Sequence, residues 1–194
     1  MRKLVSIQKI ESLSPIDGAD KIEKARVLGW DLVVKKGEFQ PGEKCLYYEI
    51  DSFVPLLPDY DFLAKAGAKK MLYDGQEIQG YRLKTMRMRG QISQGLALPL
   101  SKFAIDGELG QDVTQKLGVV LYEPPIPAEI QGETDGPIPS CLPKTDEERV
   151  QNIPDPAFNG KVYWISEKID GTSCTISRHN GDFRVSGRNW SLKE

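Results

Sequence analysis

The sequence predicts a mainly β protein with short helices, made of a small barrel followed by the beginning of a second sheet. Through residues 1–120, short runs of apolar and β-branched residues alternate with turns rich in glycine and proline, a spacing typical of small β-barrels. A second group of such runs begins at residue 158. Residues 121–157 between them are rich in proline, which favours a linker or an extended wrapping segment. We therefore expect three parts, at 1–120, 121–157 and 158–194.

The strands of the first part follow one another at short intervals. We expect them at residues 1–10, 21–27, 30–34, 45–50, 81–88 and 95–100. Residues 14–20 and 35–43 have the proline, glycine and aspartate content of turns. Residues 61–67 are the clear helical stretch. One helix among about five or six strands suits an OB-type Greek-key barrel.

The second sheet is predicted from three apolar runs. They are residues 162–165, 173–177 and 183–186. Asn180-Gly181 predicts a hairpin turn between the last two. Upstream, residues 145–152 form one or two expected helical turns that open on a capping box.

Charge and cysteine content exclude several classes of protein. The chain has 26 Lys and Arg against 28 Asp and Glu, a net charge of -2, so overall charge gives no argument for nucleic-acid binding. Residues 1–120 hold 18 basic and 16 acidic residues, and the remainder holds 8 and 12, so polyanion contacts are expected in the first part. Three widely spaced cysteines without a CxxC pair indicate neither a zinc ribbon nor a disulfide framework. They favour a reducing, cytoplasmic location.

No signal peptide or membrane span is expected, because the sequence has no long apolar run. The single histidine, His179, lies at a predicted hairpin turn. Catalysis by a histidine general base is therefore not expected.

Lys168 is the candidate nucleophile. It follows the predicted strand 162–165 and precedes Asp170 and the turn residue Gly171. A lysine attacks only when unprotonated, and nearby cations or burial can bring its pKa down from about 10.4. Asp170 could hold a metal or a water on the metal, and Gly171 lets the backbone approach a nucleotide closely. Lys-x-Asp-Gly also occurs by chance, and an exposed turn with a solvated charge pair remains the alternative.

Several longer stretches carry a family resemblance. Residues 167–173 (EKIDGTS) resemble the nucleophile motif of the covalent nucleotidyltransferases, which are DNA ligases, RNA ligases and mRNA capping enzymes. Residues 186–194 resemble the next motif of that superfamily, and 143–152 the lead-in to the nucleophile in one branch of RNA ligases. Residues 37–43, 48–52 and 88–96 resemble the N-terminal OB domain of the same branch. Over essentially its whole length, the chain thus resembles an ATP-dependent RNA ligase with an N-terminal OB domain.

The resemblance implies a reaction and roles for site residues. Lys168 would attack the α-phosphorus of ATP, with Mg²⁺ or Mn²⁺, and the AMP would pass to an RNA 5′-phosphate before a 3′-hydroxyl seals the strand. Glu167 would border the adenine, and Asp170 would orient a water on the metal. Arg188 would bind phosphate. Arg149 would contact the β- and γ-phosphates, with a surface charge on a short helix as the alternative.

The pattern of the superfamily continues beyond Glu194 with acidic motifs and a strand of paired lysines. We therefore expect this chain to be the N-terminal portion of a ligase. It would fold as an OB domain with an incomplete α+β nucleotidyltransferase domain, and the fragment alone would not adenylylate itself.

A cationic strand is the candidate RNA contact. Arg82, Lys84, Arg87 and Arg89 lie within residues 81–89, and alternation places the first two on one face and the last two on the other. One pair could follow a phosphate backbone. A solvated edge strand is the alternative. The expected partner is RNA with a nick or break, alone or in a duplex, with no membrane and no protein partner inferred.

Two other functions compete with the RNA ligase. One is a non-catalytic OB-fold RNA-binding module in which Lys168 is inert. The other is a DNA ligase or capping enzyme, against which the position of the OB domain before the nucleophile argues.

Overall fold

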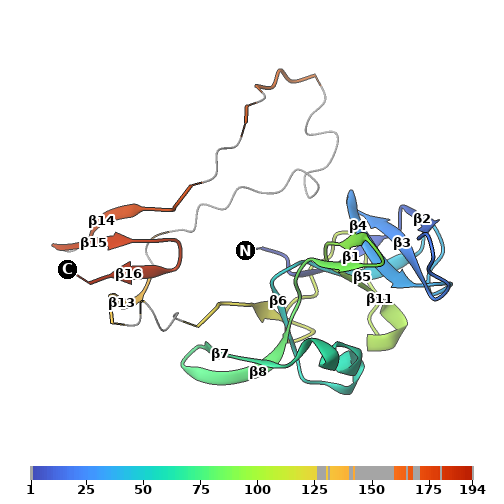
Figure 1. Cartoon of the computed structure of the whole chain (residues 1–194), viewed down its shortest axis with the longest axis horizontal. Coiled ribbons are helices and arrows are strands. Elements are labelled where there is room, and N and C mark those ends of the chain that lie inside the picture. The colour runs from blue at the N-terminus through green and yellow to red at the C-terminus, as the bar shows by residue number, and fades with distance from the viewer. Residues whose placement is uncertain are drawn as a thin grey trace. The chain divides into compact units, whose positions relative to one another are not determined.

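The chain divides into two compact units in the computed structural model, Met1–Pro124 and Pro125–Glu194. The structure describes residues 2–125, 130, 132–139, 142, 160–164, 166–167, 171–179 and 181–193. Figure 1 shows the first unit in blue to yellow and the strands of the second in yellow-orange to red. The part boundaries expected at residues 120 and 157 stay a prediction.

The first unit is mainly β, as predicted. Its strands are β1 (Val5–Lys9), β2 (Ser12–Pro15), β3 (Ile22–Val27), β4 (Trp30–Lys35), β5 (Lys44–Tyr48), β6 (Ser52–Pro55), β7 (Lys69–Tyr73), β8 (Gln76–Arg82), β9 (Met86–Met88), β10 (Gln91–Ser93), β11 (Leu96–Pro99) and β12 (Val120–Leu121). Two short 3₁₀ helices, η1 (Pro58–Ala66) and η2 (Leu100–Phe103), accompany them.

Two antiparallel sheets form the barrel. Their strand orders are β2-β3-β4 and β1-β5-β11. The chain bends between β1 and β2, so that β1 pairs with β5 while β2 pairs with β3. The interior cluster takes residues from this bend, from β3, β4, β5 and β11, and from the loop between β4 and β5: Ile10, Ala25, Val27, Leu32, Val34, Phe39, Cys45, Tyr47 and Ala97. The predicted OB-type barrel is therefore present.

Two polar contacts join β4 to the segment that enters β11, and one glycine allows the same segment to approach β5. The backbone N–H of Val33 donates to Ser93 Oγ at 3.0 Å, and the N–H of Gln94 donates to the carbonyl of Asp31 at 2.9 Å. Gly95 follows with a φ of +131°. A Cβ there would lie 2.6 Å from the carbonyl oxygen of Tyr48, so only glycine fits this approach.

A second apolar core covers the outer face of the sheet β1-β5-β11. It joins residues of that sheet to β6, β8, η1 and the stretch after η2: Leu4, Val5, Ile7, Leu46, Tyr48, Val54, Tyr60, Tyr81, Leu83, Leu98, Ile105, Val113, Leu117 and Val119. The chain between β5 and β11 supplies much of this cover, including three strands of the sheet of order β12-β6-β8-β7; the fourth, β12, follows β11 in the chain. Strand β5 thus lies between two cores.

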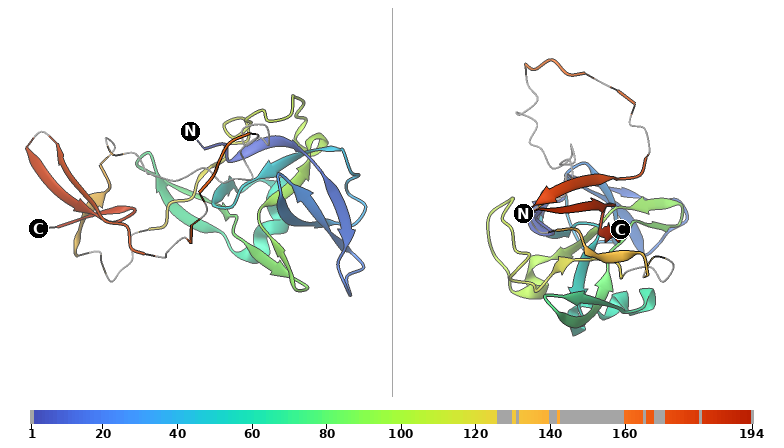
Figure 2. Two further views of the ribbon diagram at one scale, coloured as in Figure 1. Left: turned by 90° about the horizontal axis from the view of Figure 1, so that it is seen from above. Right: turned by 90° about the vertical axis from the view of Figure 1, so that its left-hand side faces the viewer.

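The second unit contains one antiparallel sheet, which Figure 2 shows from two further sides. Its strands are β13 (Thr134–Pro137), β14 (Thr175–His179), β15 (Asp182–Ser186) and β16 (Trp190–Leu192), in the order β13-β16-β15-β14. The predicted hairpin of residues 173–186 is confirmed as β14 and β15. Strand β13 comes from the proline-rich stretch.

Three expectations about strands and helices were wrong in detail. The predicted strand 81–88 is interrupted after Arg82, because Leu83 bonds to Ser52 and Asp51 and β9 then pairs with β10 instead. The turn predicted at 14–20 begins later, since β2 extends through Pro15. The predicted helix 61–67 is the 3₁₀ helix η1. In the described part of the chain, no helix is long and apolar enough to cross a membrane.

A hydrogen bond between two buried tyrosines provides a test of the second core. The hydroxyl groups of Tyr48 and Tyr60 lie 3.0 Å apart, and both residues are fully buried. We predict that Tyr48→Phe and Tyr60→Phe each lower the free energy of unfolding by about 1–3 kcal/mol, because each leaves one buried hydroxyl without this partner. The double variant should cost less than the sum, as measured by urea denaturation. Additive losses would show that the two hydroxyl groups do not depend on each other.

Burial also makes the stability of the first unit depend on pH. Burial, with a smaller contribution from Glu43, raises the pKa of Cys45 from 9.0 to about 12. The thiol ionises near pH 9 in the unfolded chain but stays neutral in the fold. Its contribution is therefore complete below pH 9 and is lost as pH rises toward 12.

We predict that Cys45→Ala flattens the fall in unfolding free energy between pH 9 and pH 12. The change in slope should approach about 1.4 kcal/mol per pH unit. Urea titrations at several pH values measure it, with Cys174→Ala as the exposed control. An equal slope in Cys45→Ala and the unmodified chain would contradict the prediction.

Candidate functional site

The predicted nucleophile region is only partly described by the structure. Lys168, Asp170 and Arg149 lie outside the described residues, so their predicted roles stay predictions. Glu167 and Gly171, on either side of the nucleophile, are both exposed. Gly171 does not have a positive φ, and a Cβ there would meet no atom within 4 Å. The conformation of this unit alone therefore does not require glycine at position 171.

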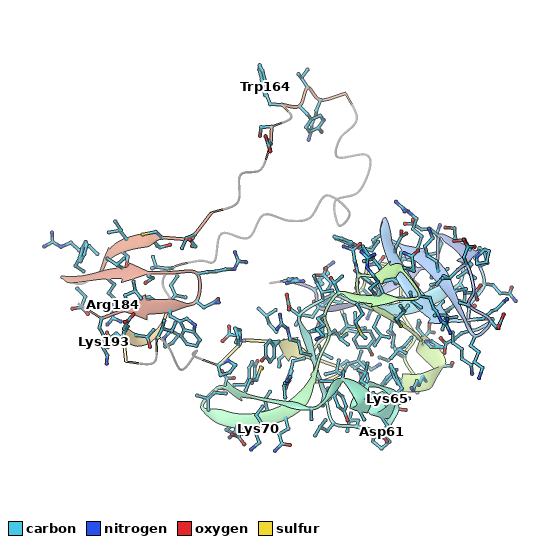
Figure 3. The ribbon with its side chains drawn as sticks, viewed as in Figure 1. Asp61, Lys65, Lys70, Trp164, Arg184 and Lys193 are labelled. Atoms are coloured by element: carbon cyan, nitrogen blue, oxygen red, sulfur yellow. The ribbon has the colours of Figure 1, made fainter. Side chains whose placement is uncertain are left out.

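The strand predicted before the nucleophile is absent from the described residues 160–164. Val162 and Trp164 are 93% and 98% exposed, and no strand of the described chain pairs with them. Figure 3 shows Trp164 projecting from an extended segment. β-Branched and aromatic residues favour a strand only when a neighbouring strand and an apolar surface receive them. Residues 162–164 have the composition of a strand, but no described strand pairs with them.

Arg188 occupies the turn between β15 and β16. Ser186 and Ser191 pair across these strands, and their buried hydroxyl groups lie 3.1 Å apart. The N–H of Gly187 donates to the carbonyl of Trp190 at 2.9 Å and narrows the turn. The exposed Arg188 side chain is therefore carried by a turn whose base is fixed by hydrogen bonds.

The structure brings the nucleophile motif close to this turn. A Cβ on Gly187 would lie 4.0 Å from the carbonyl oxygen of Ser173. Ser173 ends the nucleophile motif, and Gly187 precedes Arg188. The two motifs that resemble those of nucleotidyltransferases are thus neighbours in space, although residues 174–185 separate them along a strand–turn–strand path.

A second arginine of the same sheet has a structural role. Arg184 lies on β15, labelled in Figure 3. Its guanidinium lies 3.5 Å from Asp135 and 3.6 Å from Asp182. These two carboxylates offset the charge of Arg184, so this arginine has a structural role within the sheet.

The four cations predicted to bind RNA do not form one strand. Arg82 ends β8, and its guanidinium donates to Asp51 Oδ1 at 2.8 and 3.1 Å. The same group lies 4.6 Å from the centre of the Tyr122 ring. Asp51 balances the charge of Arg82, so Arg82 joins β8 to β6 and β12 rather than extending freely toward a ligand. The sequence could not indicate this partner, which lies 31 residues away.

The other three cations remain at the surface. Arg87 lies on β9 opposite Ile92 of β10, Arg89 lies in the turn of this hairpin, and Lys84 lies just before it. All three side chains are exposed. No salt bridge to them is formed by the described residues. The β9–β10 hairpin therefore presents positive charge that the first unit does not neutralise.

No group of three or more histidine, cysteine, aspartate or glutamate side chains that could hold a metal ion occurs among the described residues. Asp170, the residue expected to act on a metal through water, is outside them.

Comparison with known proteins defines the class of the first unit. A family of OB-fold domains matches residues 4–100, which is half of the 194-residue chain. The match ends just after β11, the last strand of the barrel. The chain therefore belongs to the OB-fold domain family, in agreement with the barrel and its strand order. No curated protein sequence matched the chain.

Solved structures extend the similarity through the second unit. The chain is 42% identical to the Naegleria gruberi RNA ligase solved with PPi, with a TM-score of 0.73, and the match covers 100% of this chain and 58% of that one. A mutant of that ligase with AMP and Mn is 43% identical over 100% of this chain and 57% of its own, with a TM-score of 0.75. Another, with ATP and Mn, is 42% identical over 99% and 57%, with a TM-score of 0.74. The resemblance to RNA ligases is confirmed, over somewhat more than half the length of that protein.

The turn of the β9–β10 hairpin gives a prediction about stability. Arg89 has a φ of +50° and is followed by Gly90 at +81°, a pair of left-handed conformations that asparagine tolerates better than arginine. We predict that Arg89→Asn raises the free energy of unfolding by about 1 kcal/mol. Urea denaturation measures it. Arg89→Ala is the matched control, since it removes the charge but keeps the strain; an equal gain from alanine would show that backbone strain is not the cause.

Proposed function

We propose that the protein containing this chain is an ATP-dependent RNA ligase that joins RNA 3′-hydroxyl and 5′-phosphate ends through a lysyl-AMP intermediate. The observation that carries the proposal is 42% identity to an RNA ligase across both units. The chain keeps Lys168, Asp170 and Gly171 in the order of the nucleophile motif. Relatives solved with ATP and Mn, with AMP and Mn, and with PPi support ATP and a divalent metal, Mg²⁺ or Mn²⁺, as cofactors.

In the first step, Nζ of Lys168 attacks the α-phosphorus of ATP. A bond forms between nitrogen and phosphorus, the bond to the bridging oxygen breaks, and pyrophosphate leaves with that electron pair. Glu167 borders the adenine, and Arg149 holds the β- and γ-phosphates. A divalent metal, when bound, would offset charge on the phosphates, and Asp170 would be the residue that holds it, through a water. The open space at Gly171 allows a nucleotide to approach the backbone.

Arg188 contacts a phosphate close to the attacked phosphorus. Its turn lies beside the end of the nucleophile motif, as the position of Gly187 against Ser173 shows. A cation here would stabilise negative charge that accumulates around the attacked phosphorus.

In the later steps the AMP passes to an RNA 5′-phosphate, and the 3′-hydroxyl then displaces it. The β9–β10 hairpin holds the RNA backbone through Lys84, Arg87 and Arg89. Arg82, already bound to Asp51, contributes less directly than the sequence alone predicted. A nick or break in RNA, alone or in a duplex, is the proposed substrate, and a reducing cytoplasmic location remains a prediction from cysteine content.

A non-catalytic OB-fold RNA-binding module is the second candidate. The cationic hairpin of the first unit favours it, because it presents charge without any contribution from Lys168. Transfer of AMP to the protein distinguishes the two candidates, because only the ligase would carry covalently bound AMP.

We predict that the full-length protein, incubated with α-labelled ATP and Mg²⁺ or Mn²⁺, carries label through denaturing electrophoresis. Lys168→Ala should abolish the labelled band, because the acceptor nitrogen is lost. Lys161→Ala is the matched control, since Lys161 is an exposed lysine just before the same segment, and it should label normally.

A labelled band of equal strength in Lys168→Ala would show that another residue accepts AMP. An unlabelled wild-type protein that still binds RNA would favour the non-catalytic module.

A further inference from the structure

The turn that carries Arg188 does not have the backbone conformation that two-residue hairpin loops favour. The N–H of Gly187 donates to the carbonyl of Trp190 at 2.9 Å and closes the turn. Arg188 and Asn189 lie between them. The favoured loops of this length place one or both central residues at positive φ, but neither Arg188 nor Asn189 has a positive φ. Other two-residue turns let the strands splay apart, so contacts from outside the turn must hold this one.

Strand β13 supplies such contacts. It is the neighbour of β16 in the sheet, as Figure 1 shows, and Pro137 at its end is paired in register with Trp190. The N–H of Ile138, the next residue, donates to the carbonyl of Asn189 at 3.1 Å. One of the two central residues of the turn is therefore bonded directly to the segment that follows β13.

Two buried serines extend this support beneath the turn. Ser191 on β16 donates to the carbonyl of Pro137 at 3.4 Å. Its hydroxyl oxygen lies 3.1 Å from the hydroxyl oxygen of Ser186 on β15. A hydroxyl group has one proton, so Ser186 donates this second hydrogen bond to Ser191. The two hydrogen bonds thus cross three strands, β13, β16 and β15, and the turn connects the last two.

The burial of these serines indicates what their hydroxyl groups contribute. Ser186 is 1% exposed and Ser191 is 0% exposed. Alanine has nearly the same size and brings no hydroxyl group that needs a partner, so an apolar pair could serve stability about as well. What the hydroxyl groups add is direction, because satisfied hydrogen bonds inside a protein fix the strands in one arrangement. The arrangement that they fix is the one that presents Arg188.

We propose that Ser186 and Ser191 are positioning residues for Arg188 in the formation of lysyl-AMP. The proposal rests on the proposed RNA ligase function. The hydroxyl groups hold the turn, and the turn holds the guanidinium beside the nucleophile motif, where Gly187 lies against Ser173. Arg188 stabilises charge around the attacked phosphorus only from the right place, because a displacement of about 1 Å can cost about 100-fold in rate. Neither serine contacts the nucleotide.

The test measures how fast the full-length protein forms lysyl-AMP from an excess of α-labelled ATP. We predict that the rate constant at saturating ATP falls by about 10-fold in Ser186→Ala and by up to about 100-fold in Ser191→Ala. Ser191→Ala has the larger effect, because it removes both hydrogen bonds whereas Ser186→Ala removes one. The ATP concentration that gives half the maximal rate should stay nearly the same, because the lost interaction belongs to the transition state.

Loss of stability gives a different pattern. Partial unfolding lowers the observed rate constant only in proportion to the folded fraction, which urea denaturation gives for each variant. A fall no larger than the loss of folded protein would overturn the proposal and assign the serines to stability alone. Ser177→Ala is the matched control, since it removes a serine hydroxyl group from β14 of the same sheet, and its rate constant should not change.

A double-variant cycle separates an effect through Arg188 from a direct one. Arg188→Ala should itself slow the reaction by about 100-fold or more. In that background Ser191→Ala should cause almost no further fall, because the side chain that it positions is gone. An equal fall from Ser191→Ala with and without Arg188 would overturn the proposal, since the serine would then act on some other group.

Failure of the proposed function gives a separate result. If the unmodified protein forms no lysyl-AMP, the ligase proposal is wrong and the positioning role of both serines is wrong with it. If lysyl-AMP forms and the rate constants of Ser186→Ala and Ser191→Ala equal that of the unmodified protein, only the positioning proposal is wrong.

Discussion

Burial of β5 on both faces is the constraint on which the first unit depends. Cys45 and Tyr47 point into the barrel interior, while Leu46 and Tyr48 enter the second core. β1 and β11 occupy its two edges, so its backbone hydrogen bonds are also complete. The strand therefore reads as a continuous apolar run rather than an alternating one. The barrel and the long insertion between β5 and β11 cannot separate without exposing one side of this strand.

Two of the stretches that resemble the OB domain of RNA ligases, residues 48–52 and 88–96, contain residues with structural roles in the first unit. Ser93 and Gly95 lie within the stretch 88–96. Ser93 accepts a hydrogen bond from β4, and Gly95 allows the backbone to approach Tyr48 closely. In the stretch 48–52, buried Glu49 binds Arg2 at 2.6 Å and Asp51 binds Arg82. These polar residues are fixed by partners within the unit. By contrast, Lys84, Arg87 and Arg89 at the β9–β10 hairpin form no salt bridge with the described residues, so their charge is available to a ligand.

The sequence predicted elements that its local pattern determines. Turn residues and apolar runs located β3, β4, β5, β11 and the β14–β15 hairpin. It missed β7 and β8 because their polar residues form strands through pairing with each other and with β6, which is a tertiary effect. It placed Arg82 correctly at the surface, but the pairing with Asp51 depends on contacts between distant parts of the chain. The strand expected at 162–165 is absent from its described residues, 162–164. These residues have strand propensity, but no described strand pairs with them.

The position of Arg188 also bears on how Lys168, the proposed nucleophile, would lose its proton. A lysine must lose its proton to attack, and either burial or neighbouring cations favour that loss. The described residues on both sides, Glu167 and Gly171, are exposed, so these flanks supply no burial. Among the described residues, the turn of Arg188 lies against the end of the nucleophile motif and brings a positive charge to it. Arg188 would then serve the nucleophile twice, by favouring its neutral form and by binding the phosphate that it attacks.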